Sequence, residues 1–252
     1  MVFTFEPLDI LLILGVAGLV TVVAFVNEPR TKALVFSLPI PFTLANLSLG
    51  EPIGAGHAVG ILNLLLFLNL ARWLHTRARV RIILTIAIAA SVYIGVGAAL
   101  NAVIPDTQGA FWTAFAVVVV TAIALLALMP DRREPRHRSE LPAPVKFVAV
   151  GGVVTVVVIL KDVLGGFMTT FPLAGVTTVY ETRKSLWTLS RHAPLLMLAV
   201  ATMMVAMRVC QRAAAMSVAW SLLPGLAAWV AVMAPVTIIR WRTDDRRARE
   251  TG

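Results

Sequence analysis

Two apolar segments of the chain each carry a proline among hydroxyl and amide side chains. Segment 27–48 contains Pro39, and segment 161–183 contains Pro172. A proline inside a helix removes one backbone donor and clashes with the carbonyl one turn earlier, so polar backbone groups are left free. At membrane depth, such groups are tolerated only inside protein or beside a watery cavity. The pattern predicts a site for a small solute or ion near the bilayer midplane, where the two segments meet.

The side chains expected to line this pathway flank the two prolines or lie on adjacent spans. They are Pro39, Asn46, Asn63, Thr169, Thr170, Pro172, Thr177, Thr178 and Glu181. Among the acids Glu181 is favoured, because Thr177, Thr178 and Glu181 share one helical face and an ionisable group inside a membrane is a functional candidate. The alternative is structural: the hydroxyls satisfy their own kinked helices, and Arg183 neutralises Glu181 near the interface.

Two histidines, His57 and His192, begin the third apolar span of each half, on opposite sides of the membrane. They are candidates for gating or proton sensing, since histidine changes charge near neutral pH. The alternative is two helix-start residues at the level of the lipid headgroups. Asn63, further along the first of these spans, either lines the pathway or ties helices together by hydrogen bonds.

The composition is that of an integral membrane protein. The chain has 252 residues, of which 59% are hydrophobic and 14% are charged, against about 25% charged in soluble domains. The formal net charge of +9 does not indicate nucleic-acid binding, because the basic residues lie between apolar runs. Motifs for catalysis, for a metal centre or for a cofactor are missing. We therefore expect no enzyme, no metal and no cofactor, and place an intramembrane enzyme third among the possible functions.

Apolar runs of about 20 residues predict about nine membrane spans in an all-α, polytopic protein. The runs are 8–26, 33–49, 55–74, 80–103, 110–129, 145–160, 163–180, 193–207 and 216–239. With the N-terminus outside and the C-terminus in the cytoplasm, all but three of the 22 basic residues lie on the cytoplasmic side, as the positive-inside rule requires. The predicted location is the cytoplasmic (inner) membrane of a bacterium, with the lipid bilayer as one partner.

An internal repeat is predicted from an offset of 133 positions, which brings Pro39 onto Pro172. Each half then has four spans with a proline-broken second helix, and the single span between them inverts the second copy. The predicted units are a first repeat, 1–105; a linker helix with a basic loop, 106–140; the inverted repeat, 141–240; and a basic tail, 241–252. Fusion of two units in one chain is compatible with a monomer, which we favour, or a homodimer.

Three short motifs in the second half resemble the GlpM family of small bacterial inner-membrane proteins. They are Gly165–Leu173 (GGFMTTFPL), the pair Tyr180-Glu181, and Trp220–Pro224 (WSLLP). The resemblance covers about 100 residues and implies that the chain is two four-helix units fused as an inverted repeat. It implies no catalytic or transport residues, because the family has no well-defined activity.

These observations predict a membrane transporter or channel for a small solute or ion. The alternative is an integral-membrane scaffold or regulatory subunit of a partner complex, which transports nothing. A continuous polar pathway would favour transport, and a sealed apolar bundle with an exposed intramembrane groove would favour a partner.

Overall fold

The computed structural model describes residues 5–25, 38–130 and 142–250, and within them all regular structure is helical. Long apolar stretches fold this way because a helix satisfies its backbone polar groups internally, as lipid requires. The helices are α1 (Pro7–Phe25), α3 (Ile40–Leu49), α4 (Ala55–Thr76), α5 (Ile82–Val103), α6 (Gln108–Leu128), α7 (Ala143–Ile159), α8 (Lys161–Leu164), α9 (Gly166–Thr170), α10 (Leu173–Glu181), α11 (Leu186–Ala213) and α12 (Val218–Glu250).

Five described helices are long and apolar enough to cross a membrane: α4, α5, α6, α11 and the part of α12 up to Val236. Shorter apolar helices lie in α1, α3 and α7. Large apolar side chains cover the outer surface, among them Ile83 and Val120, which are 72% and 67% exposed. These features suggest a multi-pass membrane protein whose outer surface contacts lipid.

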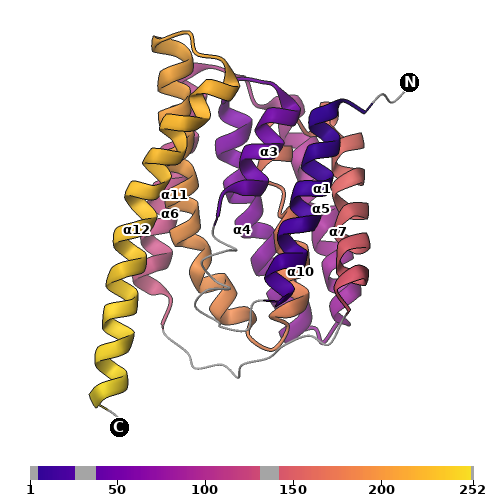
Figure 1. Ribbon diagram of the computed structural model, residues 1–252, viewed down its shortest axis with the longest axis vertical. Coiled ribbons are helices and arrows are strands. Elements are labelled where there is room, and N and C mark those ends of the chain that lie inside the picture. The colour runs from indigo at the N-terminus through magenta and orange to yellow at the C-terminus, as the bar shows by residue number, and fades with distance from the viewer. Residues whose placement is uncertain (1–4, 26–37, 131–141, 251–252) are drawn as a thin grey trace.

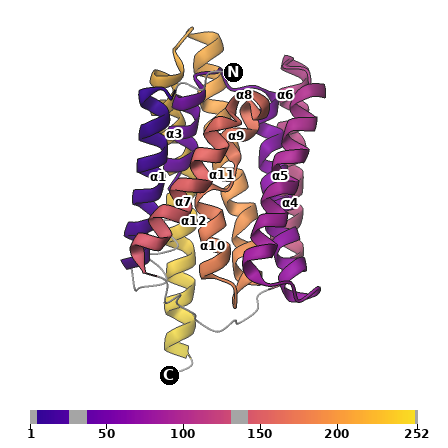
Figure 2. The ribbon, with the colours of Figure 1, turned by 90° about the vertical axis from the view of Figure 1, so that its right-hand side faces the viewer.

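The long helices run side by side, with the N-terminus and the C-terminus at opposite ends of the bundle (Figure 1). α11 and α12 form an antiparallel hairpin along one side, and α1 packs against α7 on the other. The view turned by 90° shows α8 and α9 near the upper end and α10 in the lower half (Figure 2).

Two clusters of buried apolar residues form the core. One is built mainly from α1, α4, α5, α7, α9 and α10, with Ala45 of α3, Leu164 of α8 and the start of α11, and the other from α3, α4, α6, α11 and α12. α4 belongs to both, since Phe67 and Leu68 lie in the first cluster while Ala58 and Ile61 lie in the second. α4 therefore lies along the boundary between the two clusters, together with α3 and α11, which also contribute to both.

Two predicted spans differ from the helices observed. Segment 163–180 is interrupted by Gly165 and by the Phe171–Pro172 step into α8, α9 and α10. For segment 33–49 the structure describes α3 from Ile40, with Pro39 at its N-cap, while residues 26–37 lie outside the described part of the chain. The interruptions have local causes, because Pro172 has no backbone N–H and Gly165 adopts a left-handed φ of +49°.

Candidate functional site

The site is built around α9, the short helix between Gly165 and the Phe171–Pro172 break. All five of its residues are buried. Two glycines on neighbouring helices allow this close approach. A Cβ at Gly60 of α4 would lie 2.0 Å from Thr170 Oγ1, and one at Gly97 of α5 would lie 3.3 Å from Phe167 Cβ. The bare faces of α4 and α5 thus form the seat of α9.

Hydrogen bonds from α5 hold α9 in this seat. The Tyr93 hydroxyl donates to Phe167 O at 2.8 Å and lies 2.9 Å from Thr170 Oγ1. Asn63 Nδ2, on α4, donates to Tyr93 O at 2.9 Å. The Tyr93 ring also makes an edge-to-face contact with Phe171, with centroids 5.0 Å apart. The network therefore fixes the end of α9 immediately before Pro172.

Asn46 and Pro39 approach the site from α3, which packs against α9. Asn46 is buried, and its Nδ2 donates to Phe42 O of its own helix at 2.8 Å. Its Oδ1 has no hydrogen-bond partner. Pro39 is also buried, at the start of α3. The first proline-bearing segment thus meets the second through α3 and α9.

His57 packs on the glycine kink at the start of α9. A Cβ at Gly166 would lie 2.5 Å from His57 Nδ1, and Asn101 on α5 donates to Val163 O of the neighbouring kinked backbone at 3.1 Å. His57 Nδ1 accepts a hydrogen bond from Gly54 N at 3.1 Å. In the neutral ring the proton therefore lies on Nε2, which is buried and has no partner.

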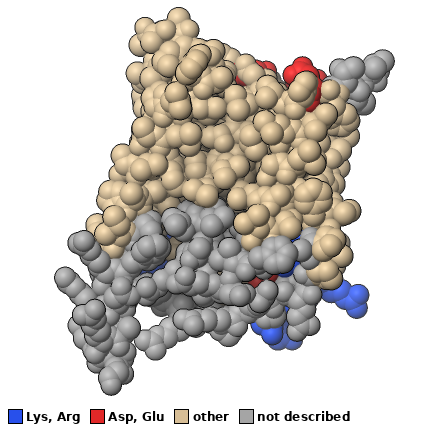
Figure 3. Space-filling view, viewed as in Figure 1, with Lys and Arg blue, Asp and Glu red and all other residues tan. Residues whose placement is uncertain are grey.

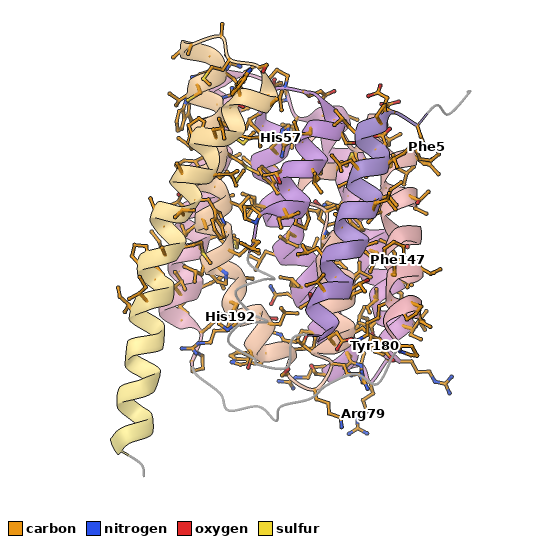
Figure 4. All side chains as sticks on the ribbon, in the orientation of Figure 1. Phe5, His57, Arg79, Phe147, Tyr180 and His192 are labelled. Carbon is orange, nitrogen blue, oxygen red and sulfur yellow. The ribbon has the colours of Figure 1, made fainter. Side chains whose placement is uncertain are left out.

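The environment of His57 was not predicted from the sequence. The side chain is only 2% exposed, so it is enclosed by protein although it lies at the start of α4. His192, by contrast, is exposed on α11. Figure 4 shows His57 towards the upper end of the bundle and His192 in its lower half. The two histidines lie far apart in unlike surroundings.

Three buried side-chain atoms around α3, α4 and α9 thus lack a hydrogen-bond partner: Asn46 Oδ1, Asn63 Oδ1 and His57 Nε2. Leaving a buried polar atom unpaired costs about 1–3 kcal/mol. Two of these atoms accept hydrogen bonds or coordinate cations, and the third donates. Each of these atoms can contact a polar group of a bound solute or ion at its own position.

The predicted threonines take different roles. Thr169 Oγ1 and Thr170 Oγ1 each donate to a carbonyl of their own helix, Gly166 O at 2.8 Å and Phe167 O at 3.3 Å, as the structural interpretation expected. Thr170 also belongs to the Tyr93 network. Thr178 is buried and Thr177 half-buried on α10. Asn63 ties α4 to α5, again as one of the two interpretations expected.

Glu181, at the end of α10, is buried against Lys146 of α7, with Nζ and Oε1 2.7 Å apart. A second ion pair lies between α1 and α8, where Nζ of the half-buried Lys161 is 3.0 Å from Oδ2 of the buried Asp9. Ser48 at the end of α3 donates to Asp9 Oδ1 at 2.5 Å. The sequence did not reveal these pairs, because Glu181 was expected to pair with its neighbour Arg183, whereas the observed partners lie on helices distant in sequence.

A buried arginine was also missed. Arg208 follows the predicted span 193–207 and was therefore placed outside it, but it lies inside α11 and is 2% exposed. Its guanidinium lies 4.2 Å from the centre of the Phe111 ring and 4.0 Å from Asp106 Oδ1. The sequence feature that could have indicated its burial is the position of Arg208 within an apolar run, MMVAMRVC.

The described residues contain no group of three or more His, Cys, Asp or Glu side chains placed to hold a metal ion. Comparison with known proteins finds no match among family models, curated proteins or solved structures.

Proposed function

We propose that this protein is a membrane transporter or channel for a small solute or ion, with its site where α3 meets the broken segment α9–α10. The observation that carries the proposal is the set of three unpaired polar atoms on Asn46, Asn63 and His57 around that break. In an apolar bundle, unpaired polar groups are costly and mark functional positions. A bound solute or ion supplies the missing partners.

The proposed inverted repeat receives support from two polar links. The offset of 133 places Ser48 on Glu181. In each half, the first turns of the first helix are tied to the end of the broken second helix: Asp9 to Ser48 at 2.5 Å, and Lys146 to Glu181 at 2.7 Å. Figure 4 shows Phe5, near the first link, at the upper end and Tyr180, beside the second, at the lower end.

In this proposal the two links act as locks on opposite sides of the site. Access from the upper end requires separation of Asp9 from Ser48 and Lys161, and access from the lower end requires separation of Lys146 from Glu181. Alternation between the two copies of an inverted repeat is the usual basis of alternating access. Opening one lock while the other stays closed would prevent a continuous leak.

The upper end is proposed to be outside and the lower end cytoplasmic, in the inner membrane of a bacterium. Figure 3 shows the described Lys and Arg side chains of this face towards the lower end and the Asp and Glu side chains mainly at the upper end. Such a bias is typical of the positive-inside rule.

Orientation can be tested with exposed positions in two turns, after removal of the single cysteine by Cys210→Ser. Ser217→Cys places a thiol between α11 and α12, and Ala78→Cys places one between α4 and α5. A membrane-impermeant maleimide added to intact cells should label only the first. Labelling of only the second would reverse the orientation.

Transport can be tested by stopped-flow shrinkage of proteoliposomes in NaCl, KCl, urea and glycerol. We expect at least one of these solutes to enter faster than it enters protein-free liposomes. The double variant Thr170→Ala/Pro172→Ala should lose most of this flux, because it removes the hydroxyl and the break. Thr202→Ala is the matched control, since Thr202 bonds only its own helix at Leu198 O in α11. Flux equal in both variants would contradict the proposed site.

One observation favours the alternative, a membrane scaffold or regulatory subunit. α9 is buried throughout and packs closely on Gly60 and Gly97. The same burial and close packing are expected of a helix that has only a structural role. If no solute in the series crosses faster than through bare liposomes, while the folded protein co-purifies with a stoichiometric membrane partner, the scaffold is the better interpretation.

A further inference from the structure

A small depression opens at the upper end of the bundle, between the start of α6 and the end of α11. Its volume is about 190 Å³. Its lining is Gln108, Trp112, Arg208, Val209, Arg212 and Ala213. The lining combines two guanidinium groups, which only donate hydrogen bonds, with apolar surface from Trp112, Val209 and Ala213, so it favours an anion.

Arg208 supplies a fixed charge beside this depression. Its Nη1 donates to Ile53 O and its Nη2 lies 3.3 Å from Gln108 Oε1. Its Nε is buried without a partner. The guanidinium does not lose its proton, and its nearest carboxylate, on Asp106, is 4.0 Å away with 64% of the side chain exposed. The buried charge is therefore only partly neutralised.

Arg212 adds a second positive charge on the same helical face. It follows Arg208 by four residues and is exposed. Like charges at this spacing destabilise a helix by a few tenths of a kcal/mol. An anion between the two guanidinium groups removes this repulsion, and an arginine pair is well suited to the oxygens of a phosphate.

The surroundings indicate where such a phosphate comes from. Trp112 is 39% exposed in the first turns of α6, and the exposed Val120 and Ile123 follow it along the same apolar helix. Trp and Arg side chains together at the end of a membrane span are typical of the headgroup level. A lipid whose phosphate lies in the depression can extend its acyl chains along α6.

We propose that this depression binds the phosphate of an anionic phospholipid headgroup, held by Arg208 and Arg212 and bordered by Gln108 and Trp112. The site is separate from the proposed transport pathway at α9 and does not depend on it. A free phosphate ion offers the same oxygens, so the experiment compares both sources.

Binding can be measured on the full-length protein in neutral detergent by native mass spectrometry and by thermal unfolding. The probes are phosphatidylglycerol, phosphatidylcholine and inorganic phosphate. We expect phosphatidylglycerol to bind and to raise the unfolding temperature more than phosphatidylcholine does. Arg212→Gln should weaken phosphatidylglycerol binding about fivefold, the factor expected for the loss of one basic residue near an anionic surface. It should still fold, since Arg212 is exposed.

The matched control is Arg77→Gln, an exposed arginine at the C-terminal end of α4. It should bind phosphatidylglycerol as the wild type does. If inorganic phosphate protects as well as the lipid, and Arg212→Gln abolishes both effects, the site takes a free anion and the lipid assignment is wrong. Three results would overturn the site: equal binding of phosphatidylglycerol and phosphatidylcholine, no binding of either lipid, or an equal loss of lipid binding in Arg212→Gln and Arg77→Gln.

Discussion

Lys146 and Glu181 form a buried ion pair that joins α7 to α10, with Nζ and Oε1 2.7 Å apart and side chains only 6% and 8% exposed. Removing two charges from water is expensive, and their attraction offsets that cost only while both are present. The pair therefore fixes the position of α10 relative to α7 more than it adds to stability. Each charge depends on the other.

Breaking this pair should cost far more than replacing it. Glu181→Met leaves the Lys146 ammonium buried without its partner and should lower the free energy of unfolding by about 3–5 kcal/mol. The double variant Lys146→Met/Glu181→Met should recover most of that loss. Denaturant unfolding in detergent measures both, with Lys184→Gln as an exposed control. A double variant as unstable as the single one would contradict the mutual dependence.

The seat of α9 predicts a contrast between two glycines. Gly60→Ala places a methyl group where Thr170 Oγ1 lies, 2.0 Å away, and overpacking of this kind costs about 1–3 kcal/mol. Gly95→Ala on α5 meets nothing within 4 Å and should stabilise by up to about 1 kcal/mol through helix propensity. Thermal unfolding of both variants tests this. Thr170→Ala should partly rescue Gly60→Ala, because it removes the clashing oxygen.

Removal of the Tyr93 hydroxyl is a smaller perturbation of the contacts that hold α9. Tyr93→Phe keeps the ring contact with Phe171 but removes the hydrogen bonds to Phe167 O and Thr170 Oγ1. Hydrogen bonds inside membrane proteins contribute about 0.6 kcal/mol each on average and at most about 1.7, so the loss of both bonds should lower the free energy of unfolding by about 1–3 kcal/mol. Unfolding in denaturant, together with faster amide hydrogen exchange in 166–171 and unchanged exchange in α12, would show that α9 is the element loosened.

Glu51, in the turn between α3 and α4, predicts a pH dependence. Glu51 is exposed, but partial desolvation by the surrounding protein, followed by the neighbouring carboxylates of Asp162 and Asp106, raises the pKa of Glu51 above its usual 4.5. An acid with a raised pKa in the folded state holds its proton more tightly there than in the unfolded chain, so stability falls as pH rises from 4.5 through the raised pKa.

Glu51→Gln removes that contribution. The variant should therefore be more stable than the wild type above this pH window and should show a flatter decline across it. Unfolding temperatures recorded from about pH 4 to pH 8 make the comparison. Parallel profiles for the two proteins would show that Glu51 is not responsible.

The sequence was most informative about residues that change the conformation of the backbone. Pro172 and the Gly165-Gly166 pair alter the helix wherever they occur, so the interruption of segment 161–183 could be predicted. Asn46 and Asn63 were recognisable as amides within apolar runs.

The partners of the charged residues could not be predicted, because they depend on which helices meet. Asp9 lies far from Lys161 in sequence, and only the packing of α1 beside the α7–α8 corner brings them together. Lys146 and Glu181 are joined in the same way. The seat on Gly60 and Gly97 gave no local signal either, since a glycine in a helix is meaningful only once the element that packs on it is known.

The seating of α9 on α4 and α5 also bears on how the protein is made. The ribosome synthesises α4 and α5 well before α9, so the early helices enter the membrane with the glycine faces at Gly60 and Gly97 bare and Tyr93 unpaired. Their packing is completed by a segment that arrives only with the second half of the chain. A fragment ending before Lys161 should therefore be a substrate for membrane proteases, and separate expression of the missing half in the same cell should protect it.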